Sequence, residues 1–157
     1  MSQAGSKAGR LIIGIGNPSR GDDALGPLAI ERLEALNPPD VELLTDFQLQ
    51  VEYLLDMEGR VEIIFVDASV TGDEPFAFIP VVARSDRSHT SHALAPGALL
   101  TAFESHYGRP SPPAFVLAIR AYAFELGEGL SPLAANNLDA ATAFLEAYLA
   151  GAPRLQH

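Results

Sequence analysis

Apolar residues follow two patterns along the chain: short consecutive runs, and runs that repeat every three or four positions. The short runs predict β-strands at residues 11–15, 41–45, 63–66, 76–82 and 114–119. The three-and-four spacing predicts helices at residues 24–36, 51–57, 96–107 and 132–150. Of these segments, Ile63–Val66 is the clearest strand, because an unbroken apolar run is typical of a central strand that is covered on both faces.

The alternation of strands and helices predicts the fold class. Parallel neighbours need a long connection, and a helix supplies it, so we expect a single-domain three-layer αβα sandwich. Its twisted sheet is mostly parallel and has about five strands. The domain is predicted at residues 10–150, with a flexible tail at 1–9 and another at 151–157.

The amino-acid composition excludes several classes of function. Ten Lys and Arg face twenty Asp and Glu, a net charge of −10, which argues against nucleic acid as a partner. The absence of Cys excludes disulfides, thiolate metal ligands and a Cys nucleophile. No apolar run is long enough for a membrane span, so we expect a cytoplasmic protein without a membrane partner.

The first candidate site is the turn from Gly14 to Asp23, which joins the first strand to the first helix. Its glycines allow close backbone approach, and Asp22 and Asp23 stand where the helix begins. One of these acids alone fits a helix N-cap. A dinucleotide site would need Gly or Ala where Ser19 stands, and two carboxylates would repel a pyrophosphate. Together they would instead attract a cation.

Two further candidates follow at the same predicted edge of the sheet. Asp67 directly follows the central strand. A carboxylate that is buried there needs a cation, a hydrogen-bond donor or a proton to offset its desolvation. The alternative is that Asp67 only caps the turn after the strand. His89 and His92 precede the helix at Pro96, and either one alone fits a surface residue. Asp23, Asp67 and His92 together offer two oxygens and one nitrogen, a set suited to a borderline divalent metal with open positions.

The residues resemble the hydrogenase maturation proteases, the endopeptidases that trim the large subunit of nickel-iron hydrogenase. The order and spacing of three separated motifs carry the resemblance, which spans nearly the whole chain: Gly14–Asn17 with Gly21–Gly26, Ile64–Ala68, and Ser91–Leu94. It implies an aspartic-type endopeptidase that removes the C-terminal extension of the large-subunit precursor. The precursor is then the partner, and we expect the protease to be a monomer.

The resemblance also assigns roles to residues. It implies that Asp23, Asp67 and His92 contact nickel already inserted in the precursor, so that cleavage waits for metal loading. The nickel arrives with the substrate, and we expect the free protein not to retain it. After the second strand many members have Asp-Gly-Gly-Thr, whereas this chain has Asp46 followed by Phe-Gln-Leu-Gln. Asp46 keeps the acid and is a further catalytic candidate. This variant is similar to the branch that serves soluble, NAD-linked bidirectional hydrogenases.

Two functions from other classes remain as alternatives. A peptidyl-tRNA hydrolase also begins with a strand followed by Gly-x-Gly-Asn-Pro, which this chain shares through Pro18. The Thr-Arg-His-Asn stretch that should follow is replaced by Arg20–Asp23, and the negative charge opposes tRNA. A dinucleotide-binding module is the second alternative, and the missing third glycine opposes it.

Overall fold

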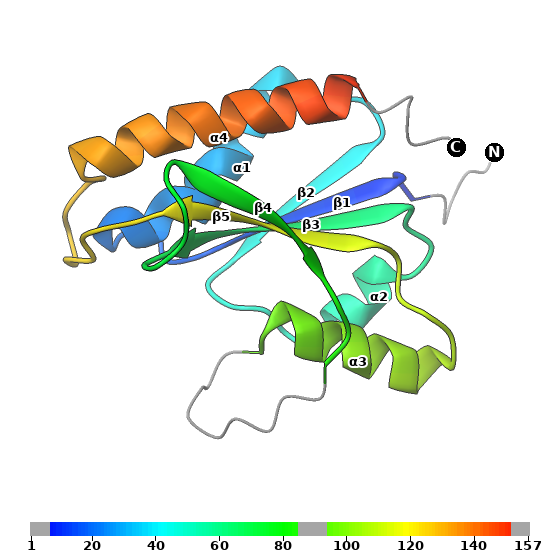
Figure 1. Ribbon diagram of the computed structural model, residues 1–157. Helices are drawn as coiled ribbons and strands as arrows, with labels where there is room; N and C mark the ends of the chain where they lie inside the picture. The colour runs from blue at the N-terminus through cyan, green and yellow to red at the C-terminus, as the bar shows by residue number, and fades with distance from the viewer. Residues whose placement is uncertain (1–6, 85–93, 152–157) are drawn as a thin grey trace.

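The computed structural model describes residues 7–84 and 94–151, which form a sheet with helices on both faces (Figure 1). The strands are β1 (Arg10–Ile15), β2 (Val41–Asp46), β3 (Glu62–Ser69), β4 (Phe76–Val81) and β5 (Ala114–Arg120). The helices are the short 3-10 helix η1 (Gly21–Ala24), α1 (Leu25–Leu36), α2 (Tyr53–Met57), α3 (Pro96–Tyr107) and α4 (Pro132–Ala150). No helix within the described ranges is long and apolar enough to cross a lipid bilayer.

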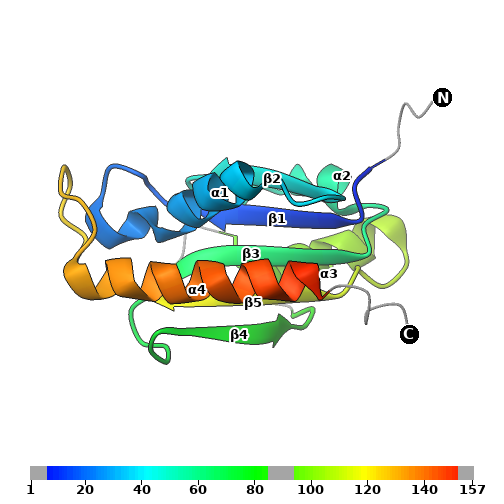
Figure 2. The same cartoon turned by 90° about the horizontal axis from the view of Figure 1, so that it is seen from above.

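Over the described residues, the sheet has five strands in the order β2-β1-β3-β5-β4, seen from above in Figure 2. All neighbouring pairs are parallel except β4 and β5, which pair antiparallel and place β4 at one edge. The predicted αβα sandwich with a mostly parallel sheet is therefore confirmed. Because four strands run the same way, their carboxyl ends meet at one edge of the sheet, where ligands of such folds bind.

Each face of the sheet buries its own apolar cluster, because side chains alternate between faces along a strand. On one face Ile12, Ile64 and Leu117 pack beneath α1 and α4. On the other face Ile13 and Phe65 join the residues that α2 and α3 contribute. The alternation continues along β3, so Asp67, two residues after Phe65, lies on the face that α2 and α3 cover.

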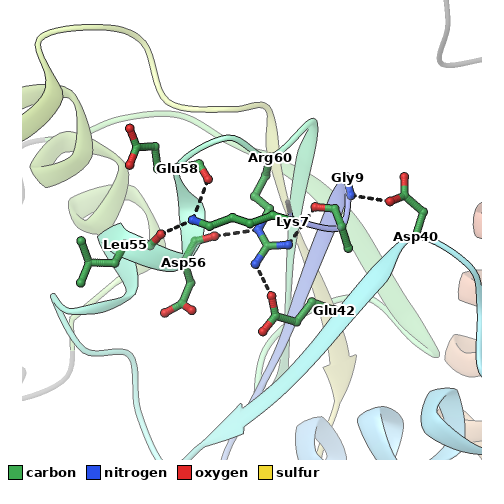
Figure 3. A network of polar contacts seen from close by, with 9 residues as sticks. Lys7, Gly9, Asp40, Glu42, Leu55, Asp56, Glu58 and Arg60 are labelled. Carbon is green, nitrogen blue, oxygen red and sulfur yellow. Dashed lines mark hydrogen bonds and ion pairs between the residues drawn. The ribbon is translucent and has the colours of Figure 1, made fainter. Parts of the chain in front are cut away.

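A polar network anchors the start of the chain at the opposite end of the sheet (Figure 3). The guanidinium of Arg60, only 7% exposed, donates to the carbonyl of Ala8 at 2.8 Å and pairs with the carboxylate of Glu42. Lys7 donates to the carbonyl of Glu58 at 2.9 Å. The last residues of the expected N-terminal tail are thus bound to the turn that follows α2, and Arg60 links this turn to β2.

Candidate active site

The turn after β1 brings the carboxylate of Asp23 to the sheet edge. Gly16 has a φ of +146°, and a Cβ there would lie 2.0 Å from the carbonyl oxygen of Asp23, so only glycine fits. One carboxylate oxygen of Asp23 accepts a hydrogen bond from the backbone N–H of Asn17 at 2.9 Å, which fixes its direction. The glycine therefore serves close packing of η1 against the end of β1.

Asp22, its neighbour in the chain, has a different role. Its side chain is completely buried, and it accepts four hydrogen bonds from Tyr122 N–H (2.8 Å), Ala123 N–H (3.0 Å), and the N–H and hydroxyl of Ser131 (both 2.7 Å). Neither Asp22 nor Asp23 caps α1, whose N-cap is Ala24. The alternative that one of these acids is only a helix N-cap is therefore wrong, and Asp22 instead anchors the segment before α4.

Asp67 lies within β3, which continues for two residues beyond it, to Ser69. The sequence places it just after the strand, so this boundary is wrong, because the strand-pairing of β3 with β5 persists through Ser69 and Arg120. One carboxylate oxygen of Asp67 accepts the N–H of Ala68 at 2.8 Å. The strand holds Asp67 on the central part of the sheet, close to its carboxyl edge.

Asp23 and Asp67 line one cavity of about 390 Å³, the site cavity. Its walls come from the end of β1, the segment after β2, and the residues that lead into α3: Ile15, Gly16, Phe47, Gln48, Leu49 and 94–96. Three connections from separate parts of the chain thus meet around two carboxylates. Of the lining residues, Leu49 is buried and Phe47 is exposed at the rim.

The electrostatics of the site cavity favour a cation. The pKa of Asp67 is raised to about 7, mainly by burial; the Ala68 N–H lowers it, and the nearby carboxylate of Asp23 adds to the rise. At neutral pH, Asp67 is therefore shared between its protonated and ionised forms. A divalent cation at this position would relieve the repulsion between the two acids and displace that proton.

Asp46 ends β2 next to the site cavity but is held by donors of its own. One oxygen accepts the N–H of Phe47 and the other accepts the hydroxyl of Tyr53, both at 2.7 Å. Burial, and then the hydrogen bond to Asp46, raise the pKa of Tyr53 far above its ordinary value, so the phenol remains a donor. Sequence reasoning missed this partnership, because nothing in the seven-residue separation signals it.

The structure brings together two of the three predicted nickel contacts, Asp23 and Asp67. His92, the third, and the nearby His89 lie outside the described residues. Within residues 7–84 and 94–151, no three His, Cys, Asp or Glu side chains group as a metal site would require. Leu94 follows closely after His92 and lines the site cavity, so the chain enters the described part of this loop beside the two acids.

The fold matches solved structures closely. The chain aligns over 93% of its length with 95% of the NiFe hydrogenase maturation protease HycI from Thermococcus kodakarensis, at 25% identity and a TM-score of 0.73. The chain has the structure of a hydrogenase maturation protease. This confirms the predicted resemblance and, with it, the assignment to the peptidases. No protein-family model matches the sequence, and no curated protein matches it either.

Two Escherichia coli structures agree with this fold. The hydrogenase maturating endopeptidase HybD shares 24% identity over 89% of this chain and 91% of its own, with a TM-score of 0.71. The solution structure of an endopeptidase from the same organism covers the same shares at 24% identity and a TM-score of 0.69. At these identities the two likenesses establish the shared fold, and the hydrogenase maturation protease architecture therefore extends over nearly all of the present chain.

Proposed function

We propose that the protein is an endopeptidase that removes the C-terminal extension of a nickel-loaded hydrogenase large-subunit precursor. The observation that supports this best is the site cavity, in which Asp23 and Asp67 face the same space at the carboxyl edge of the sheet. Nickel belongs to the substrate in this proposal. Asp23, Asp67 and His92 contact it, and an empty precursor lacks the cation that the two acids favour.

The chemistry is hydrolysis of one peptide bond. A water molecule attacks the scissile carbonyl carbon and the C–N bond breaks. The water oxygen remains in the new carboxylate, and both water protons end on the leaving amine, which becomes an ammonium group. A divalent ion beside the carbonyl lowers the pKa of bound water and stabilises the oxyanion. Each oxygen of Asp46 accepts one hydrogen bond, which fixes the carboxylate and leaves a second lone pair on each oxygen. We propose that Asp46 uses these remaining lone pairs to orient a water or the peptide from the neighbouring strand end.

The raised pKa of Asp67 suits the proposed checkpoint. Without a cation, Asp67 is partly protonated at neutral pH, and its neutral form neither binds a metal nor accepts a proton. Arrival of the nickel-loaded precursor supplies the charge that ionises Asp67. Ionisation of Asp67 therefore depends on the presence of nickel in the precursor.

The decisive experiment compares two precursors that differ only in nickel. Purified protein is mixed with nickel-loaded or nickel-free precursor, and release of the extension is followed by mass spectrometry. We expect processing of the nickel-loaded form alone. Equal processing of both forms would contradict the proposal that cleavage requires nickel in the precursor. Asp23→Ala and His92→Ala should abolish trimming, whereas Asp139→Ala, an exposed acid on α4, should cleave normally. Circular dichroism verifies that each variant is folded.

A further inference from the structure

A second hollow lies beside the site cavity, between the end of β4 and the beginning of α3. This β4–α3 groove has a volume of about 270 Å³, and its walls include Val82, Arg84 and Val116. It shares two wall residues with the site cavity, Ala95 and Pro96. The two hollows therefore adjoin across the residues that open α3, and a peptide that leaves one can enter the other.

Apolar side chains of the described residues contribute to the groove. Val82, just after β4, lines the groove and is 62% exposed. Val116 on β5 also lines the groove and is only partly buried. An apolar side chain of a bound peptide would remove this surface from water, which is favourable in proportion to the area covered.

Arg84 brings a positive charge to the groove, although the net charge of the whole chain is −10. Within the described residues, seven other Lys and Arg side chains donate a hydrogen bond, whereas the side chain of Arg84 donates none to that part of the chain. The N-terminus of α3 borders the groove, and no described side chain caps it. A guanidinium and an uncapped helix start both favour a carboxylate ligand.

The backbone holds Arg84 at this place. The N–H of Arg84 donates to the carbonyl of Gly97 at 3.1 Å, which joins the segment after β4 to the first turn of α3. A Cβ at Gly97 would lie 3.0 Å from the carbonyl oxygen of Val82, so glycine allows the segment to pass this closely. The wall that presents Val82 and Arg84 is therefore fixed against α3 by the fold.

We infer that the β4–α3 groove binds the C-terminal extension of the precursor on the far side of the scissile bond. An apolar residue of the extension packs against Val82 and Val116, and an Asp or Glu side chain of the extension pairs with Arg84. This inference rests on the proposed function, because it names where the leaving peptide lies. It requires that the extension carry an apolar residue followed by an acidic one.

The test uses the intact protein, the nickel-loaded precursor and steady-state kinetics. Val82→Glu should raise KM about tenfold with little change in kcat, because the groove contributes binding and no chemistry. The matched control is Val61→Glu, which changes the same residue type at a similar exposure, 60%, at a position that lines neither the groove nor the site cavity. Val61→Glu should leave both constants unchanged.

A charge exchange tests the role of Arg84. Arg84→Glu should raise KM about fivefold, as expected for a solvent-accessible ion pair of about 1 kcal/mol. A precursor whose extension carries Lys in place of the acidic residue should return the KM of Arg84→Glu to the wild-type value. The same precursor should raise the KM of the wild-type protein. Equal kinetics for Val82→Glu and Val61→Glu, without rescue by the Lys extension, would overturn the groove assignment. Failure of the wild-type protein to cleave any precursor would instead refute the proposed endopeptidase.

Discussion

Asp22 and Ser131 lie 109 residues apart in the sequence, yet Ser131 gives both its backbone N–H and its hydroxyl to the carboxylate of Asp22. Ser131 is also the N-cap of α4, where its hydroxyl oxygen accepts the N–H of Ala134. Through this one contact, the η1 turn is joined to the start of the last helix. Asp23 projects from the same short helix, so the Asp22–Ser131 contact supports the position of a site residue.

We expect Asp22→Asn to destabilise the protein by about 2–3 kcal/mol at pH 7, because an amide cannot accept on both ends and at least one buried donor loses its partner. Burial alone would raise the pKa of Asp22, but the hydrogen bonds from Ser131, Ala123 and Tyr122 outweigh it and lower the pKa below its ordinary 3.8. The measurement is the free energy of unfolding in urea, for wild type and variant.

The pH dependence of that difference gives the control. A carboxylate with a lowered pKa stabilises the fold fully above the unfolded-state value of 3.8, and this stabilisation disappears as pH falls through the native-state value. The gap between wild type and Asp22→Asn should therefore stay constant above about pH 5 and shrink below about pH 4. A gap that is unchanged at pH 3 would show that the ionised form is not what stabilises the fold.

Asp67→Asn should have the opposite effect on stability. The pKa of Asp67 is raised to about 7, so the native state holds the proton more tightly than the unfolded state does, and stability falls between about pH 4 and pH 7. The neutral variant avoids this loss. In metal-free buffer we expect it to be about 1–3 kcal/mol more stable than wild type at pH 8, and equal to it below pH 4.

The same variant separates stability from function. Asp67→Asn should lose processing of the nickel-loaded precursor although it is the more stable protein, because an amide is a poorer metal ligand. Asp23→Asn gives the comparison, since removal of its charge should lower the pKa of Asp67 in a carboxyl-carbon NMR titration. A pKa of Asp67 that does not move would contradict the electrostatic contact between the two acids.

The fold is largely predictable from the sequence, because each element carries a local signal. Pro96–Tyr107 begins with proline and continues with helical spacing, and its bounds are as predicted.

The site is predictable only in part. The sequence identifies Asp23 and Asp67 as acids near the ends of strands, but their meeting depends on the parallel order of β1 and β3. The partners of Asp22 and Asp46 come from residues whose positions only the tertiary structure decides.

Gly16→Ala should disrupt both the turn and the site. The added Cβ would meet the carbonyl oxygen of Asp23 at 2.0 Å, and φ at +146° is strained for alanine. We expect a loss of stability of about 2 kcal/mol or more, with loss of processing. Gly129→Ala is the control, because a Cβ there would point into open space and its φ lies outside the left-handed region. Similar behaviour of both variants in thermal unfolding would refute the tight packing at Gly16.

Tyr53→Phe tests whether Asp46 takes part in the reaction. The substitution removes the hydroxyl that donates to Asp46 at 2.7 Å and leaves the ring in the apolar cluster beneath α2. A hydrogen bond of about 1 kcal/mol corresponds to about a fivefold change in rate. We therefore expect kcat on the nickel-loaded precursor to fall about fivefold with KM unchanged. Tyr107→Phe loses the hydroxyl contacts to the carbonyl of Leu54 (3.4 Å) and to Glu58, neither of which involves Asp46, so its kcat should match wild type. A Tyr53→Phe protein that is less stable but cleaves at the wild-type rate would restrict Asp46 to a structural role.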